Sequence, residues 1–466
     1  MQRFKLIISF VIPILLVFIP IEGISVIEKR VIGIFVMAAL LWILEPIPIY
    51  ATSVLIIVLE LITISDKGLI FFRETTNPET FGELLDYKSI FATFASPIIL
   101  LFMGGFFLAM AATKYRLDLN LSRIMLKPFG QKPIFVMLGL MIITAVFSMF
   151  MSNTATTAMM LSIIVPVLAL FKDGDKGKTA FILCIPVAAN IGGIGTPIGT
   201  PPNAIALKYL TGANSISFGE WMSFGVPYVF ILLLIGWLLL TVFFKTDTKT
   251  IKLNINATLI KSKKAYIVYI TFAVTILLWL TDFVHGMNAY VVAMIPVAVF
   301  ISTGIITKDD LKLISWDVLW LVSGGIALGL AMDKSGLAKH LVSAIPFENY
   351  STAVIIACAS VIMLIMSNFM SNTASANLLL PILAALGTSV SDFQNPGGIV
   401  TLILAATISS SVAMTLPIST PPNALAYGTE AVKTGDMAKM GIFMGIIGIF
   451  LAFLTVYILH LIGFKS

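Results

Sequence analysis

The stretch FSMFMSNTATTAMML, residues 147–161, contains a Ser-Asn-Thr triplet inside apolar sequence. The stretch MSNFMSNTASANLLL, residues 366–380, repeats the triplet in nearly the same surroundings, at an offset of 219 residues (367 minus 148). A single polar cluster in a hydrophobic segment commonly caps a helix or bonds a neighbouring helix. Two copies in one chain favour a different interpretation, in which a structural unit is duplicated.

Two other pairs of segments recur at almost the same offset. PIGTPPNAIA at residues 197–206 matches PISTPPNALA at residues 417–426, and the Gly-Gly pair at 104–105 matches the pair at 324–325, each 220 residues apart. All three pairs come in the same order. We therefore interpret the chain as two copies of one unit.

The composition indicates a membrane protein. Of the 466 residues, 59% are hydrophobic and 11% are charged, whereas soluble domains have about 25% charged residues. Several apolar stretches are long enough to cross about 30 Å of hydrocarbon. We predict an all-α polytopic membrane protein. The net charge of +6 does not indicate a nucleic-acid partner, because loop lysines and arginines more often set membrane orientation.

The predicted layout has about 11 transmembrane helices and two re-entrant hairpins, each hairpin broken at a Ser-Asn-Thr cluster. Residues 1–28 form an extra transmembrane helix rather than a cleaved signal peptide, since no small-residue cleavage site follows them. The other segments are repeat 1 at 29–244, with a hairpin at 133–171 and a broken helix at 179–210; a cytoplasmic loop at 245–264; and repeat 2 at 265–466, with a hairpin at 350–390 and a broken helix at 397–428.

The basic loops predict the orientation of the chain. Residues 113–132 contain five basic side chains and one acidic one, and residues 245–264 contain six lysines and one aspartate. With a cytoplasmic N-terminus both loops lie inside, as basic loops prefer, and only the pair Lys29–Arg30 falls outside. Five crossings then separate the two clusters. The halves are therefore inverted repeats, as in many secondary transporters, and the C-terminus is extracytoplasmic.

The motif-bearing stretches exclude several functions. Residues 133–171, 179–207, 354–390 and 396–427 contain no carboxylate, lysine, arginine or histidine. A proton relay needs such groups, and an ATPase needs a phosphate-binding loop that the sequence lacks. An intramembrane enzyme using Ser152 or Ser371 would need a neighbouring base. An ion channel fits inverted repeats less well than a transporter does.

The polar motifs suit binding of a cation and an anion together. Ser, Asn and Thr oxygens can coordinate sodium, and their O–H and N–H groups can hold carboxylates. Where a helix begins, its free N–H groups attract an anion. Paired prolines break the second helix, and we expect Asn203 and Asn423 to cap the helices that follow. Each half then builds one cation site, and both halves share one anion site whose charge the cations offset.

At these residues the chain resembles the divalent anion/sodium symporter family, near its bacterial sodium-coupled dicarboxylate transporters. The resemblance rests on the doubled Ser-Asn-Thr, each followed by Thr-Pro-Pro-Asn, at residues 200–203 and 420–423. It implies a homodimer in a bacterial inner membrane, with a scaffold domain and an elevator-type transport domain. The substrates would be C4 dicarboxylates such as succinate, malate and fumarate, coupled to at least two Na⁺ without an organic cofactor. An exchanger, or a sodium-coupled citrate or sulfate transporter, is the alternative.

The resemblance also implies which residues bind. The substrate set is Ser152, Asn153, Thr154, Thr200, Ser371, Asn372, Thr373, Thr420 and Pro421. The first sodium set is Ser148, Ser152, Asn153 and the Gly199 carbonyl. The second sodium set is Ser367, the Met370 carbonyl, Asn372 and the Ser419 carbonyl. Because Gly199 stands opposite Ser419, and Thr196 opposite Leu416, we expect the two sodium sites to be unequal.

Overall fold

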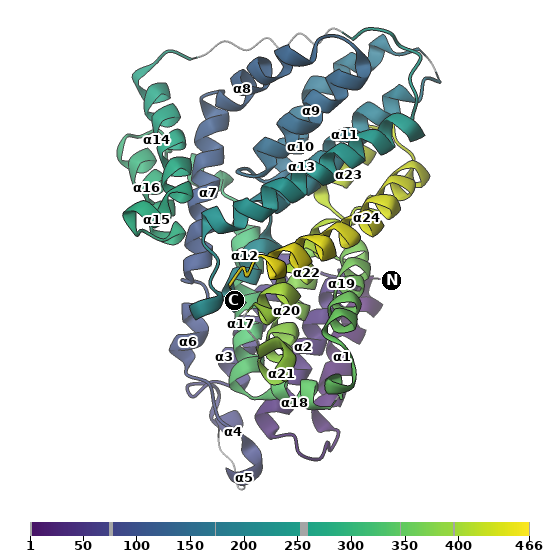
Figure 1. Cartoon of the computed structure of the whole chain (residues 1–466). Helices are drawn as coiled ribbons and strands as arrows, with labels where there is room; N and C mark the ends of the chain where they lie inside the picture. The colour runs from purple at the N-terminus through teal and green to yellow at the C-terminus, as the bar shows by residue number, and fades with distance from the viewer. Residues whose placement is uncertain are drawn as a thin grey trace.

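The computed structural model describes residues 2–73, 78–172, 174–251, 260–344, 346–394 and 397–465. The described chain is helical, and outside its helices the only β-type pairing in these ranges is an isolated bridge between Ser65 and Leu85. The all-α prediction is confirmed (Figure 1). The predicted loop at 245–264 lies partly outside the described residues.

Seven helices in the described ranges are long and apolar enough to cross a membrane. They support a multi-pass membrane protein, while the count of about 11 spans stays a prediction. These segments are Tyr87–Lys114, Gly177–Gly195, Phe218–Phe243, Lys263–Leu280, Trp316–Lys334, Thr352–Phe369 and Thr434–Leu461. Shorter apolar helices stand among them, including Ile49–Thr63 and Ala289–Ser302.

The N-terminal helices pack against one another. Helix α1 (Gln2–Phe18) lies on α2 (Val26–Leu44), which lies on α3 (Ile49–Thr63). Helix α2 begins with a capping box in which the Ser25 hydroxyl accepts from the Glu28 N–H and the Glu28 carboxylate accepts from the Ser25 N–H. These reciprocal bonds satisfy two donors that a helix start leaves free.

The first glycine of each Gly-Gly pair allows close helix packing. Gly104 in α7 (Pro97–Lys114) faces α16 (Ala289–Ser302), where an added Cβ would lie 2.4 Å from the Ala293 carbonyl oxygen. Gly324 in α17 (Trp316–Lys334) faces α3, where an added Cβ would lie 2.4 Å from the Ser53 Cβ. A side chain at either position would push the helices apart.

Each Ser-Asn-Thr cluster stands where one helix ends and the next begins. Helix α9 (Pro133–Ser148) is followed by α10 (Asn153–Ile164), and α19 (Thr352–Phe369) by α20 (Asn372–Ser389). The breaks therefore occur at the predicted positions. Whether each pair re-enters on one membrane face stays a prediction.

Each Thr-Pro-Pro loop likewise joins two helices. Helix α11 (Gly177–Gly192) precedes α12 (Pro201–Tyr209), and α22 (Gly398–Ser411) precedes α23 (Pro421–Tyr427). Helix α10 packs on α23, and α20 packs on α12. The helix after one half's Ser-Asn-Thr cluster thus meets the helix after the other half's Thr-Pro-Pro loop.

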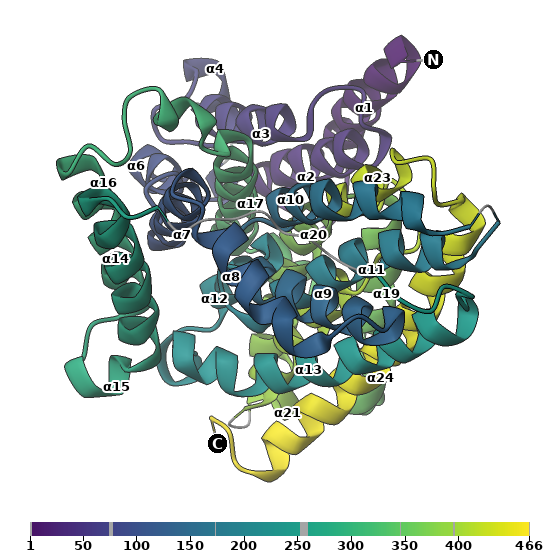
Figure 2. The same ribbon diagram turned by 90° about the horizontal axis from the view of Figure 1, so that it is seen from above.

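The remaining helices surround this centre. Helices α13 (Phe218–Phe243) and α24 (Thr434–Leu461) pack side by side, and α14 (Lys263–Leu280) with α16 lies beside α7 (Figures 1 and 2). The short helices are α4 (Ile70–Arg73), α5 (Pro78–Phe81), α6 (Tyr87–Ala92), α8 (Leu117–Leu126), α15 (Asp282–His285), α18 (Leu337–Ser343) and α21 (Ser391–Gln394). Six short 3₁₀ turns complete the described elements: Lys127–Phe129, Val165–Leu170, Gly193–Gly195, Gly212–Asn214, Asp310–Leu313 and Phe347–Asn349.

Candidate functional site

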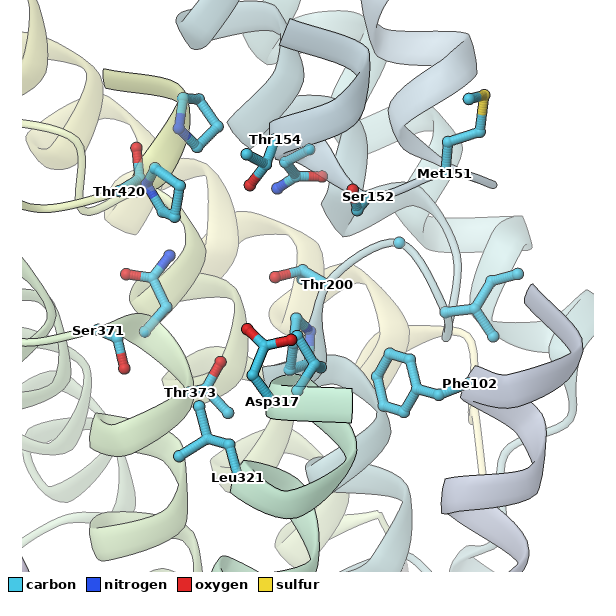
Figure 3. Close-up of a pocket in the computed structure, with 18 of the residues that line it drawn as sticks. Phe102, Met151, Ser152, Thr154, Thr200, Asp317, Leu321, Ser371, Thr373 and Thr420 are labelled. Carbon is cyan, nitrogen blue, oxygen red and sulfur yellow. The ribbon is translucent and has the colours of Figure 1, made fainter. Parts of the chain in front are cut away.

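Both pairs of motifs line one cavity of about 260 Å³ (Figure 3). This volume is close to the lower end of the roughly 300–1,000 Å³ of small-molecule pockets, as suits a small ligand. The cavity brings together all nine residues of the predicted substrate set. They are Ser152, Asn153, Thr154, Thr200, Ser371, Asn372, Thr373, Thr420 and Pro421.

The two Ser-Asn-Thr loops present helix N-termini to the cavity. Ser152 caps α10 by accepting from the Ala155 N–H at 3.1 Å, and Ser371 caps α20 by accepting from the Ala374 N–H at 3.1 Å. The first residue of each helix, Asn153 or Asn372, lines the cavity. The positive ends of two helix dipoles therefore face the cavity, an arrangement that favours an anion.

Three members of the first predicted sodium set converge around Gly193. The buried Ser148 hydroxyl lies 2.7 Å from the Ala189 carbonyl oxygen and bonds the Asn153 Oδ1. A Cβ added to Gly193 would lie 2.9 Å from that Oδ1 and 3.0 Å from the Gly199 carbonyl oxygen. Side-chain and carbonyl oxygens thus gather in one place. The fourth member, Ser152, uses its hydroxyl to cap α10.

The second predicted sodium set contains two oxygens without a protein partner. Among the described residues, neither the buried Ser367 hydroxyl nor the Asn372 Oδ1 has a hydrogen-bond partner. Buried polar atoms in folded proteins are normally satisfied, so these two are available to a ligand. Met370, which follows the last residue of α19, and Ser419 are also buried. Asn372 and Ser419 line the cavity, whereas Ser367 and Met370 are not among its lining residues.

The two halves tie their loops together with different residues. In the first half the Thr196 hydroxyl bonds the Met149 carbonyl. In the second half the Ser419 hydroxyl donates to the Asn368 carbonyl at 3.0 Å. Met149 and Asn368 are equivalent positions, 219 residues apart. Leu416, the counterpart of Thr196, has no hydroxyl to make this bond, and Ser419 makes it instead.

The expected roles of Asn203 and Asn423 as helix caps are wrong. Thr200 and Thr420 hold the N-cap positions, and the Asn423 N–H bonds the Thr420 hydroxyl. The asparagine amides instead donate back to loop carbonyls. Asn203 bonds Gly193 at 2.9 Å and Thr196 at 2.8 Å, and Asn423 bonds Met414 at 2.8 Å and Leu416 at 3.0 Å. A cap would bond N–H groups, whereas these amides hold the preceding loop in shape.

Sequence reasoning missed two residues at the site. Asn190 in α11 donates to the Thr420 hydroxyl at 3.1 Å and to the Asn423 Oδ1 at 3.3 Å, so it joins the two halves. An asparagine inside an otherwise apolar helix is a feature of the sequence that could have identified Asn190 as a site residue. Asp317 at the start of α17 also lines the cavity. Nothing in its local sequence distinguishes it from an ordinary first-turn acidic residue.

The comparisons identify the family. The family described as sodium:sulfate symporter transmembrane region matches residues 1–462, and this chain belongs to it. The sodium-dependent dicarboxylate transporter SdcS of Staphylococcus saprophyticus is 33% identical over 92% of this chain and 86% of its own length. SdcS of Staphylococcus aureus strain NCTC 8325 is 32% identical over 91% and 85%.

Other relatives extend the comparison. The uncharacterized transporter C3B8.04c of Schizosaccharomyces pombe is 30% identical over 93% of this chain, which spans 50% of that protein. The crystal structure of the YdaH transporter of Alcanivorax borkumensis matches with a TM-score of 0.59 at 13% identity, covering 89% of this chain and 99% of that one. At that identity the likeness concerns the fold alone. The family and these relatives are transporters and not enzymes.

Proposed function

We propose that the protein is a sodium-coupled symporter that carries C4 dicarboxylates such as succinate, malate and fumarate into the cell. The observation that carries this proposal is the single cavity lined by both Ser-Asn-Thr loops and both Thr-Pro-Pro loops. Two helix N-termini provide partial positive charge for carboxylates. The names of the SdcS relatives support both the sodium dependence and the dicarboxylate substrate.

We assign two sodium ions to the two predicted sets of oxygen ligands. Ser148, Asn153 and the Gly199 carbonyl would hold the first ion, with Ser152 at its edge. Ser367, Asn372 and the carbonyls of Met370 and Ser419 would hold the second. The nine cavity residues would hold the dicarboxylate between the two ions. Removing a dianion from water is costly, and the bound sodium ions offset that cost, so the anion and the cations bind together.

The packing supports an inverted-repeat transporter. We take α3 as the counterpart of α16 in the other repeat, and α7 as the counterpart of α17. Two-fold pseudo-symmetry then predicts that if α3 packs on α17, α16 packs on α7. Both contacts are present. The pairs α9 with α11 and α19 with α22 correspond in the same way. Such repeats commonly alternate the access of a central site. We propose an elevator movement of the motif-bearing helices, in a homodimer of the inner membrane with a cytoplasmic N-terminus and an extracytoplasmic C-terminus.

A second candidate is sodium-coupled sulfate transport, because the family description names sulfate. Sulfate is also a dianion, but it is compact and presents a single charged centre. Two Ser-Asn-Thr loops from different halves suit a ligand with two separated carboxylates better. The uptake assay described next also distinguishes citrate transport and dicarboxylate exchange from succinate symport.

Uptake into proteoliposomes tests the proposal. Radiolabelled succinate is supplied with an inward gradient of either sodium or potassium. We expect uptake only with sodium, with a sigmoidal dependence on its concentration. Uptake that ignores sodium but requires internal dicarboxylate would identify an exchanger. Sodium-driven uptake of sulfate or citrate without succinate uptake would show that sulfate or citrate, and not a C4 dicarboxylate, is the substrate.

A further inference from the structure

The cavity contains one carboxylate of its own. Asp317 lies in the first turn of α17 and is exposed to the cavity that the two motif pairs line. Figure 3 shows its carboxylate directed into the cavity that Thr200 and Thr373 also line. Among the described residues lining the cavity, Asp317 alone carries a charge at neutral pH. A negative charge is unexpected beside a site for an anion.

Asp317 also stands apart from the carboxylates near it in sequence. Asp310 is paired with the Lys114 ammonium at 2.5 Å, and Asp309 with the Lys312 ammonium at 2.8 Å. Within the described part of the chain the Asp317 carboxylate has neither a hydrogen-bond partner nor an ion-pair partner. A first-turn aspartate stabilises the helix dipole, but that role needs no place in a cavity. Its charge therefore acts directly on whatever occupies the cavity.

The charge balance of the cavity gives Asp317 a role. Two sodium ions and two helix N-termini compensate a ligand with two negative charges. A third negative charge on the ligand is repelled by Asp317, since like charges at a shared site oppose one another. We propose that Asp317 is a specificity-determining residue that discriminates against anions carrying a third negative charge. This inference rests on the proposed function and deepens it.

Two inhibitors of matched shape isolate the charge. Tricarballylate has three carboxylates, and its monoamide replaces one of them with a neutral group of nearly the same size. Each is tested as a competitor of sodium-driven succinate uptake, at a pH where every carboxyl group is ionised. In the unmodified protein we expect the monoamide to inhibit about tenfold more strongly, equivalent to about 1.4 kcal/mol. In Asp317→Asn we expect this ratio to fall close to one.

Two control variants separate charge from other effects. Asp317→Glu keeps the charge and should keep the ratio, which shows that the asparagine variant acts through charge rather than through local structure. Asp309→Asn removes an exposed carboxylate that does not line the cavity, and it should leave the ratio unchanged. Succinate uptake is measured separately in each variant, and each inhibition is expressed relative to that variant's own uptake.

The outcomes distinguish this inference from the proposed function. A ratio that stays unchanged in Asp317→Asn, with each inhibition measured against that variant's own succinate uptake, would overturn the inference alone. Equally poor inhibition by both compounds in all proteins would mean that size excludes them, and would also overturn it. Absence of sodium-driven succinate uptake in the unmodified protein would overturn the proposed function, and this inference with it.

Discussion

At the residue scale, the two halves differ in how their equivalent serines are used. The Ser148 hydroxyl is occupied by the Ala189 carbonyl and by Asn153. Its counterpart, the Ser367 hydroxyl, has no partner among the described residues. A cation ligand with no protein bond can be removed without breaking the fold. Ser367 is therefore the better position at which to test a sodium site.

Ser367→Ala should weaken the response to sodium. Loss of one oxygen ligand to a charged group removes roughly 1.5–3 kcal/mol, so the sodium concentration for half-maximal uptake should rise about tenfold. Succinate affinity at saturating sodium should change little. Ser360→Ala is the matched control, because Ser360 is also a buried serine of α19 without a hydrogen-bond partner among the described residues, but it lies outside the predicted sodium set. Equal sodium curves for both variants would remove Ser367 from the site.

Asn153→Asp should suppress succinate uptake at least about tenfold, because it sets a negative charge against the ligand. The aspartate keeps an oxygen that can accept from Ser148, so the protein should still fold. Initial rates in proteoliposomes measure the effect, and the melting temperature in detergent checks the fold. Asn349→Asp adds the same charge on an exposed turn and should leave uptake intact. Normal kinetics in Asn153→Asp would contradict the site assignment.

At the element scale, each Thr-Pro-Pro loop is held to the neighbouring Ser-Asn-Thr loop by one hydroxyl. Thr196 does this in the first half, and Ser419 does it in the second. Both halves therefore have a hydrogen bond between these two loops, but a different residue supplies its hydroxyl in each half. Gly199, the counterpart of Ser419, serves another purpose. An added Cβ there would lie 2.4 Å from the Gly193 carbonyl oxygen.

Gly199→Ser and Ser419→Gly exchange the equivalent residues of the two halves, and we expect the first change to be more damaging than the second. Gly199→Ser places a side chain against backbone at 2.4 Å and should abolish uptake and lower the melting temperature. Ser419→Gly loses the bond to Asn368 and should cost about 1–3 kcal/mol of stability while keeping some uptake. Thermal unfolding and succinate uptake are measured for both. Equal tolerance of the two changes would refute this account of the asymmetry.

At the scale of the whole molecule, buried charges link helices that are distant in sequence. Lys208, in the helix that follows the first Thr-Pro-Pro loop, donates to the Ile326 carbonyl of α17 at 2.7 Å. The charges of Glu60 in α3 and Asp333 in α17 act on it. Glu60 is fully buried, and neither of its carboxylate oxygens has a hydrogen-bond partner in the described ranges. The charge of Lys208 acts on the Glu60 carboxyl group, although no ion pair within 4.0 Å joins these two described side chains.

Removing either of these two interacting groups should destabilise the protein. Lys208→Met or Glu60→Gln takes away one partner of a buried polar group and should cost roughly 1–3 kcal/mol. The double variant removes both groups and should recover most of that loss. Melting temperatures of the four proteins complete the cycle, with Lys88→Met as an exposed control. Additive losses in the double variant would show that the two residues do not interact.

The sequence alone was enough to locate the helix breaks and nine of the residues that line the cavity. Local chemistry explains why. Ser152 and Ser371 are N-cap residues, paired prolines cannot continue a helix, and a duplicated order of motifs indicates corresponding elements. The all-α class follows from composition, and the family follows from the doubled motif, which the comparisons confirm.

Only the tertiary structure revealed which distant groups meet. Asn190 bonds Thr420 across 230 residues, Asp317 faces a cavity built from other helices, and the charge of Glu60 acts on Lys208. The direction of the Asn203 and Asn423 amides also depends on loop carbonyls rather than on their place at a helix start. The spacing of residues along the chain indicates which of them lie on the same face of a helix. It does not record what a packed neighbour brings to that face, because those contacts depend on how helices distant in sequence pack together.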